Sequence, residues 1–304
     1  SASRYGKGSH IRNLLGGIRD DEKVISILPM ERSLIENPEG HFLMFATANG
    51  RIKKSRLSEY SRINRNGKFA LKFADGDSDN LVSVRPATNA DHVVLVSASG
   101  NACRFMPAEE KTRISPETGE SVTTYVVRVQ GRISQGVSGM KLSGNDKVIG
   151  MIVTDDFDTS VLTISKYGMA KRSRLGSGEM LPLTEAGTPI VDESGDQIFE
   201  RDGYRKTNRG TKGVRTMSLR DGDEIVGVRQ IPDLDDQLFM LTGSGMMIRM
   251  VSGQTRETLG KVTKGTRIME LRNRNRTGYE DEIVFVARLP SELISTDDSL
   301  EEEE

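Results

Sequence analysis

Glycines and basic residues occur together at one place in the chain where their spacing suits anion binding. The stretch NRGTKGVRTMSL at residues 208–219 has two glycines and three basic residues, which lead into a run of alternating apolar positions. Glycine lets a backbone approach a phosphate and present N–H groups to it, while Arg and Lys supply charge. The alternating run predicts a half-buried strand. We therefore expect an anion-binding turn that leads into a core strand.

The same combination recurs along the chain. Each copy has an anchor glycine with Leu or Phe six residues after it, and the last four copies also have Leu or Met four residues after it. This period of two indicates a glycine strand in every copy. The unequal spacing of the copies is typical of a constant core with loops of variable length. The anchors are Gly8, Gly67, Gly136, Gly213 and Gly265.

Two further elements accompany the glycine strand. The second is a short strand entered from a polar turn, as in DEIVGV (223–228), and it occurs five times. The third is a hairpin with Thr or Ser three residues before a turn glycine and a basic residue four residues after it. A turn glycine suits a tight hairpin that needs positive φ. The hairpin occurs four times, as FLMFATANGRIKK, VVLVSASGNACR, VLTISKYGMAKR and LFMLTGSGMMIR.

Composition limits the class of protein. The chain has 304 residues and one cysteine, which offers no disulfide framework and favours a reducing, intracellular compartment. No apolar run approaches the length of a membrane span. The net charge of -1 conceals an asymmetry, since residues 176–200 and 297–304 carry six acids each. The remaining chain has 43 basic and about 32 acidic residues, which favours a polyanionic partner.

About four strands per repeat predict an all-β fold, a propeller-like array of about five four-stranded blades. The 31 glycines and the β-branched patterns leave few helix-length amphipathic windows, so a helical solenoid is disfavoured. A WD-type propeller is a poor match, because the chain has no tryptophan and its repeat is longer.

The order of these elements resembles the C-terminal domain of the DNA gyrase A subunit. The stretches closest to that family are SRYGKGSHIRNLL, KVISILPM, FATANGRIKKSRLSEY, GYRKTNRGTKGV and TKGTRIMEL. The resemblance runs from Ser3 to Leu293 and is interrupted by longer loops at 108–124 and 175–203. It implies a β-pinwheel, whose blades exchange strands and whose rim wraps duplex DNA. As part of the bacterial, cytoplasmic, nucleoid-associated enzyme, the chain would support ATP-dependent negative supercoiling.

The resemblance also implies a domain organisation and partners. We expect one β-pinwheel domain over residues 1–294 and an acidic, disordered tail over 295–304. Blade repeats would lie near 1–60, 61–128, 129–206, 207–257 and 258–294, with an acidic insertion at 176–203. The expected partners are double-stranded DNA, the gyrase A cleavage core and the gyrase B subunit in an A2B2 assembly, with no membrane and no small-molecule substrate.

One departure from the family concerns the gyrase box, a glutamine-led heptapeptide of its first blade. No such box occurs here, and NRGTKG at 208–213 is its nearest echo. Five glycine strands and five second elements accompany only four hairpins, so we interpret the chain as a piece of a longer polypeptide that lacks the box-bearing blade. The alternative is the corresponding domain of the topoisomerase IV A subunit, in which boxes are degraded.

The candidate DNA-binding residues follow from the repeats. Those of the glycine turns are the stronger candidates, because a solvated surface has no reason to repeat the sign of its charge. The hairpin residues have an alternative role, pairing with acids of the adjoining blade. The turn set is Arg4, Lys7, Arg65, Lys68, Arg132, Arg209, Lys212, Lys261 and Lys264, and the hairpin set is Lys53, Lys54, Arg104, Lys171, Arg172 and Arg249; Arg51, Arg56, Arg174 and Arg205 are additions.

Catalysis finds little support in the sequence. His10, His41 and His92 have no cysteine or paired carboxylate at ligand spacing, and Cys103 is interpreted as a small buried hydrophobe. We expect no catalytic centre, metal or cofactor in this chain, with ATP and Mg²⁺ used by other parts of the enzyme. The remaining alternatives are a protein-interaction propeller, which needs an apolar rim, and a propeller enzyme, which needs acids or histidines at its channel.

The two acidic segments allow several interpretations. The tail is either a solvated segment or a tethered competitor of DNA for the basic rim. The insertion would compete in the same way or contact other parts of the enzyme.

Overall fold

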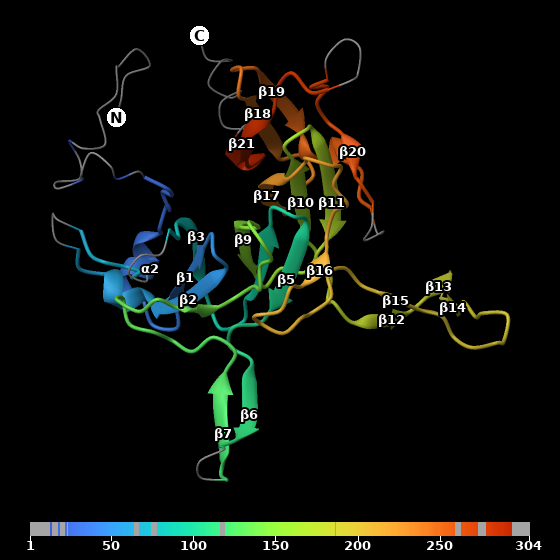
Figure 1. The fold of residues 1–304 in the computed structure, drawn as a ribbon. Helices are drawn as coiled ribbons and strands as arrows, with labels where there is room; N and C mark the ends of the chain where they lie inside the picture. Colours follow the sequence, from blue (N-terminus) through green and yellow to red (C-terminus); the bar gives the residue numbers. More distant parts are fainter. Residues whose placement is uncertain are drawn as a thin grey trace, which may run out of the picture.

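The computed structural model describes residues 13, 18, 22, 24–63, 67–73, 78–115, 119–185, 187–258, 263–272 and 278–293. Within them, four larger antiparallel sheets follow one another along an arc (Figure 1). One strand of each sheet lies on the concave side of the arc and packs against its counterpart in the next sheet. The all-β, propeller-like architecture predicted from the repeat is thus confirmed.

We number these sheets blades 1 to 4, and give the strands of each from the concave side outwards. Blade 1 contains β3 (Leu81–Ala87), β1 (Phe42–Thr47), β2 (Arg51–Arg56) and β8 (Val137–Ser138). Blade 2 contains β9 (Val148–Thr154), β4 (His92–Ser97), β5 (Asn101–Phe105) and β16 (Val214–Arg215). Blade 3 contains β17 (Ile225–Ile231), β10 (Ser160–Ser165), β11 (Met169–Arg174) and β20 (Thr266–Arg267). Blade 4 contains β21 (Ile283–Leu289), β18 (Gln237–Thr242) and β19 (Met247–Val251).

An aspartate ties each inner strand to the hairpin beside it. Asp79, the first residue of the second element in blade 1, accepts a hydrogen bond from the Asn49 N–H at 2.8 Å, directly before the turn glycine Gly50. Asp146, Asp223 and Asp281 accept from the corresponding turn N–H in the other blades. A carboxylate that accepts a backbone N–H satisfies a donor that the two-residue turn leaves unpaired. The polar start of the second element therefore closes the hairpin tip.

The hydrophobic core lies between the blades. One cluster joins blades 1 and 2, a second joins blades 2 and 3, and a third joins blades 3 and 4. All six residues of β4 and all six of β10 are buried, because blades 2 and 3 are covered on both faces. Gly150 and Gly227 lie where a Cβ would meet Val228 and Val286 of the next inner strand. Small residues thus allow adjacent inner strands to approach closely.

Two of the sequence repeats contribute strands to three different blades. In residues 129–206, the glycine strand β8 joins blade 1, the second element β9 joins blade 2, and the hairpin β10–β11 belongs to blade 3. The next repeat is divided in the same way, since β16, β17 and β18–β19 lie in blades 2, 3 and 4. A repeat therefore has no core of its own, and its strands are stable only within the array.

The described residues form four blades, where the repeat predicts about five. The first copy of the second element, residues 22–27, forms no strand in its described part, and its side chains Val24, Ile25 and Ile27 are exposed. In the described blades an inner strand pairs with the hairpin that precedes it, and the described residues before 22–27 include no such hairpin. The predicted glycine strand at Gly8 and the acidic tail at 295–304 lie outside the described residues.

The two long loops expected from the sequence contain strands of their own. The first is the hairpin of β6 (Glu110–Ile114) and β7 (Ser121–Tyr125). The second is the acidic insertion, where β12 (Met180–Pro182) pairs with β15 (Phe199–Arg201), and β13 (Thr184–Glu185) pairs with β14 (Thr188–Pro189). Both project from the blades (Figure 1). The described helices are short: α2 (Arg32–Glu36), η1 (Leu57–Tyr60) and η2 (Ser252–Gln254).

Replacing an anchor glycine tests the exchanged strand. We expect Gly213→Ala to lower the free energy of unfolding by about 3 kcal/mol or more, because a Cβ there meets the main chain of β5. Gly67→Ala is the matched control: Gly67 has a similar φ of +72°, with no atom of the described residues within 4 Å of the added Cβ. Its expected loss is about 1 to 2 kcal/mol. Urea denaturation followed by circular dichroism measures both, and equal losses would contradict the exchange.

Candidate nucleic-acid interface

The outermost strands β8, β16 and β20 each begin directly after an anchor glycine. Gly136, Gly213 and Gly265 have φ values of +77°, +73° and +74°, a conformation that glycine adopts at no steric cost. A Cβ on any of them would lie closer than 3.0 Å to a carbonyl oxygen of the adjacent hairpin strand. The backbone of each turn therefore lies directly against the sheet edge, where no side chain fits.

The glycine turns of successive blades also contact one another. They form a band on the convex side of the arc, outside the hairpins. It consists of the segments around Gly67, Gly136, Gly213 and Gly265, the first of which starts at residue 68 and the last of which ends at residue 271. This band, which we call the rim, is continuous through main-chain hydrogen bonds: Lys72 N–H to Ser134 O at 3.4 Å, Gly210 N–H to Gly139 O at 2.8 Å, Lys141 N–H to Thr211 O at 2.9 Å, and Ser218 N–H to Thr263 O at 3.1 Å.

Four exposed cations lie on the rim beside the anchors of blades 2 and 3. Lys212 and Lys264 directly precede their anchors, and Arg215 and Arg267 follow them by two residues. Within the described part of the chain, Arg267 pairs with Glu270 at 2.6 Å, and the other three cations form no ion pair. The predicted turn set includes both lysines and neither arginine. Their equal offset from the anchor was the signal that would have found them.

Other residues of the predicted turn set are less accessible. Lys68, Arg132 and Arg209 are half-buried. Lys68 Nζ donates to the Glu59 carbonyl at 3.2 Å, and Arg209 Nε donates to the Val126 carbonyl at 2.8 Å, where burial lowers the pKa of the guanidinium. Arg209 thus also ties the turn of blade 2 to the neighbouring loop. The predictions for Arg4, Lys7, Gly8, Arg65 and Lys261 lie outside the described residues.

The predicted hairpin cations lie in a different environment from the one expected. Five of the six have side chains inside the molecule, where they hold blades together and have no surface to offer to DNA. Their ammonium and guanidinium groups donate mainly to main-chain carbonyls of neighbouring segments. The five buried residues are Lys53, Lys54, Arg104, Lys171 and Arg172, with exposed fractions of 0%, 2%, 0%, 2% and 8%.

Arg104 shows why these cations recur at the same offset. It projects from β5 towards blade 3, where Nη1 donates to the carbonyls of Leu175 and Tyr204 at 2.8 and 2.9 Å. Arg172 occupies the same position one blade on, and its Nε donates to the Thr255 carbonyl at 2.9 Å. A long side chain with N–H donors at this position bridges two blades. Blade packing alone therefore explains why a basic residue recurs four residues after each hairpin glycine.

Desolvation accompanies this burial. It lowers the pKa of Lys53 and Lys171 to about 8 and that of Arg104 to about 10. The alternative of pairing with acids of the adjoining blade holds for Arg172, which bonds Glu257 at 2.9 Å. Lys53 instead donates to the Ala70 and Arg132 carbonyls at 2.6 and 2.5 Å.

Arg249 is the exposed exception. It lies on β19 of blade 4 and donates to Gln237 of its own sheet, with its guanidinium 5.7 Å from the centre of the Phe239 ring. In the described part of the chain, no further sheet packs on this face. Its exposure therefore reflects its place at the end of the arc.

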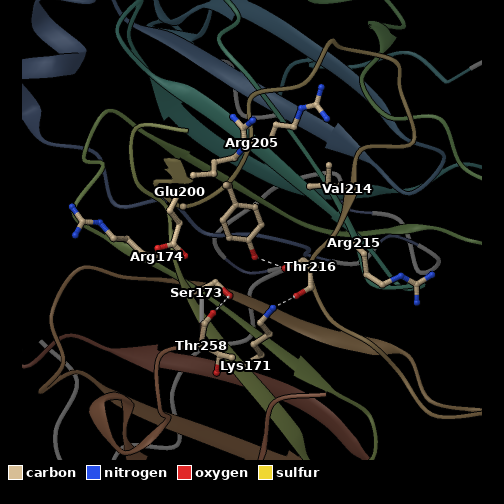
Figure 2. Close-up of a pocket in the computed structure, with 12 residues that line it drawn as sticks. Lys171, Ser173, Arg174, Glu200, Arg205, Val214, Arg215, Thr216 and Thr258 are labelled. Atoms are coloured by element: carbon tan, nitrogen blue, oxygen red, sulfur yellow. Dashed lines mark hydrogen bonds between the residues drawn. The ribbon is translucent and has the colours of Figure 1, made fainter. Parts of the chain in front are cut away.

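The acidic insertion forms ion pairs with basic residues at its base. Glu179 pairs with Lys206 at 2.6 Å, and Asp202 approaches Arg174 at 3.4 Å. Beside them is a pocket of about 140 Å³ between β11 and residues 200–216. Figure 2 shows Lys171 bonded to Thr216 within it, at 2.6 Å, while the guanidinium groups of Arg174, Arg205 and Arg215 point outwards.

His92 and Cys103, for which we expect no catalytic role, are both packed inside the molecule. His92 is buried beside Arg104 and against Phe157, and desolvation together with the Arg104 charge lowers its pKa to about 4. The Cys103 thiol is buried within the core of blades 1 and 2. Among the described residues, no three His, Cys, Asp or Glu side chains gather to hold a metal. The same residues include no helix long and apolar enough to cross a membrane.

Comparison with known proteins places this geometry in a family. The sequence matches the DNA gyrase C-terminal domain, beta-propeller, over residues 1–29, 41–88, 121–155, 198–232 and 236–290, which is more than half of the chain. The chain belongs to this family. The DNA gyrase A subunit of Rickettsia prowazekii is 30% identical over 292 residues, covering 88% of this chain and 29% of that protein. The Escherichia coli gyrase A protein is 29% identical over 289 residues, covering 95% of this chain and 26% of that protein.

Solved structures share the fold. The C-terminal domain of DNA topoisomerase IV has a TM-score of 0.68 at 19% identity, covering 97% of this chain and 75% of that one. The DNA gyrase A C-terminal domain has a TM-score of 0.60 at 18% identity, covering 93% and 76%. This chain spans less than a third of the length of the two gyrase A relatives named above.

The buried ammonium of Lys171 predicts a pH dependence of stability. Its pKa in the folded protein is about 8, against 10.5 for the free side chain. Between these values the unfolded chain binds more protons, so this group makes the free energy of unfolding rise with pH from about 8 to 10.5. We expect Lys171→Met to reduce that rise. Denaturant titrations at several pH values measure it, with exposed Lys212→Met as control, and an identical effect of both variants would contradict the buried charge.

Proposed function

We propose that this chain binds duplex DNA along the rim and bends the helix around its convex side. The observation that carries the proposal is the continuous line of glycine turns, with exposed cations at equal offsets from the anchors of blades 2 and 3. Turn backbones that lie flat against a sheet edge leave room for a phosphate to approach, and flanking Lys and Arg neutralise it. No feature of the described rim selects a base, so binding is largely independent of sequence.

Bending requires several contacts at once. Curving a site of 20 to 30 base pairs through 40 to 90° costs on the order of 1 to 6 kcal/mol. One solvated lysine contributes too little to offset this cost, whereas phosphate contacts on successive blades together exceed it. The fixed order of blades along the arc gives the bent DNA one handedness. This handedness is the property that a supercoiling enzyme requires from a wrapping domain.

We further propose that the chain acts as a part of DNA gyrase in the bacterial cytoplasm, on nucleoid DNA. The gyrase A cleavage core and the gyrase B subunit would be its partners in an A2B2 enzyme. Strand cleavage and the use of ATP and Mg²⁺ belong to those parts. The support is the identity to gyrase A proteins along most of this chain.

A DNA topology assay tests the wrapping. Relaxed circular plasmid is incubated with the chain and a nicking-closing enzyme, and the linking number is measured after the protein is removed. We expect a shift of one sign that grows with protein concentration and disappears as salt is raised. DNA binding without any shift in linking number would contradict wrapping while leaving simple binding intact.

Removal of rim charge should reduce both affinity and salt dependence. We expect the triple variant Lys212→Gln, Arg215→Gln and Lys264→Gln to make the negative slope of log affinity against log salt shallower by about 2.7. This corresponds to about 0.9 for each lost phosphate contact. The melting temperature should change little, because these side chains are exposed and form no ion pair within the described residues. Fluorescence anisotropy with a duplex of about 40 base pairs measures the slope.

The matched control replaces a cation that is exposed but lies away from the rim. Lys147 is such a residue, in the loop before the inner strand β9. Lys147→Gln should leave the slope unchanged. An equal loss of slope from this variant alone, or an unchanged slope in the triple variant, would remove the rim as the binding surface.

A further inference from the structure

Two arginines occupy equivalent positions on inner strands, on the opposite side of the blades from the rim. Arg85 of β3 and Arg229 of β17 each directly follow the second-element pattern, after Val84 and Val228. The strand between them, β9, has Ile152 at the same position. Both arginines line a cavity of about 150 Å³ on the concave side, where the inner strands succeed one another (Figure 1).

The lining of this cavity carries positive charge and no carboxylate. Arg288 and Gln230 also line it, and its other described lining residues are apolar. Arg288 is neutralised by Asp236 at 2.8 Å. Within the described part of the chain, Arg85 and Arg229 form no ion pair. Their guanidinium groups donate only to main-chain carbonyls there, Val84 O at 2.9 Å for Arg85, and Val228 O at 2.7 Å and Val286 O for Arg229.

This arrangement is unfavourable without a counter-ion. Desolvation lowers the pKa of both guanidinium groups, and the charge of Arg85 lowers the pKa of Arg229 further. The buried arginines between blades differ in this respect. Desolvation of Arg104 is partly offset by the carboxylates of Asp202 and Glu179, and Arg172 bonds a carboxylate directly. A cation that is desolvated beside a like charge gains most from an anion that enters between the two.

We propose that this concave cavity is a binding site for a phosphate-type oxyanion, held between the guanidinium groups of Arg85 and Arg229. Each guanidinium has N–H donors beyond those bonded to carbonyls, in a planar fork that matches phosphate oxygens. The Gln230 Nε2 donates one N–H to Thr154 Oγ1 at 3.1 Å, and its second N–H is a further, neutral donor. The cavity volume of about 150 Å³ is several times the roughly 30 Å³ that one water occupies in the liquid. A tetrahedral oxyanion fits there, apart from the DNA-binding rim.

Calorimetric titration of the 304-residue chain with inorganic phosphate tests the site, at constant ionic strength and without DNA. We expect saturable binding of one phosphate per chain, at least ten-fold weaker in Arg85→Gln and in Arg229→Gln. Arg215→Gln, on the rim, is the matched control and should bind as the unaltered chain does. Equal weakening in the control, or binding without saturation, would overturn the proposal.

Two further measurements separate stability and ligand source from the site itself. Arg85→Lys retains charge but loses the planar fork, so it should fold normally, by circular dichroism, and still bind phosphate several-fold more weakly; unchanged affinity would overturn the bidentate clamp. A nucleoside monophosphate that competes with inorganic phosphate indicates a phosphate ester, and failure to compete indicates free phosphate. If duplex DNA displaces the phosphate, the phosphate binds on the rim and the proposal is overturned. If rim variants fail to bind DNA, only the proposed DNA binding is affected and the anion site in the concave cavity stands.

Discussion

The close main-chain contact between an anchor glycine and a hairpin strand far upstream is the constraint on which the rest of the structure depends. At Gly213, the backbone lies so near the Ala102 carbonyl that no side chain fits between them. This contact places β16 at the edge of blade 2 and sets the start of the rim turn. Because β8 and β20 are placed in the same way by Gly136 and Gly265, one local geometry builds both the blade edges and the candidate DNA surface.

Positive charge in this chain has two physical roles that look alike in sequence. Cations next to the anchors, such as Lys212 and Lys264, are exposed on the rim. Cations four residues after the hairpin glycines, such as Arg104 and Arg172, are buried and donate to carbonyls of the next blade. Both recur with the repeat, since blade packing imposes this periodicity and the proposed DNA binding requires the same one. Burial, rather than charge, separates the cations that join blades from the cations that are free to bind DNA.

The family membership and the geometry support each other at different levels. The sequence matches the DNA gyrase C-terminal domain, beta-propeller, and the structure shows that the blades exchange strands, which leaves no repeat able to fold alone. The concave arginines Arg85 and Arg229 lie on a different surface from the rim. Their lack of carboxylate partners within the described residues distinguishes them from Arg172, which joins blades and bonds Glu257. A propeller-like array thus presents two chemically different basic surfaces, one convex and one concave.

The sequence by itself determined the all-β class, the four hairpins and the strands of the later repeats, because period-two patterning and turn glycines are local properties of the chain. It also identified Lys212 and Lys264 as rim candidates, through their constant offset from the anchors. Only the tertiary structure decided that a repeat such as residues 129–206 is shared among three blades and that Lys53, Arg104 and Lys171 are buried. The physical reason is that strand partners and burial depend on packing between segments about a hundred residues apart, which no local pattern encodes.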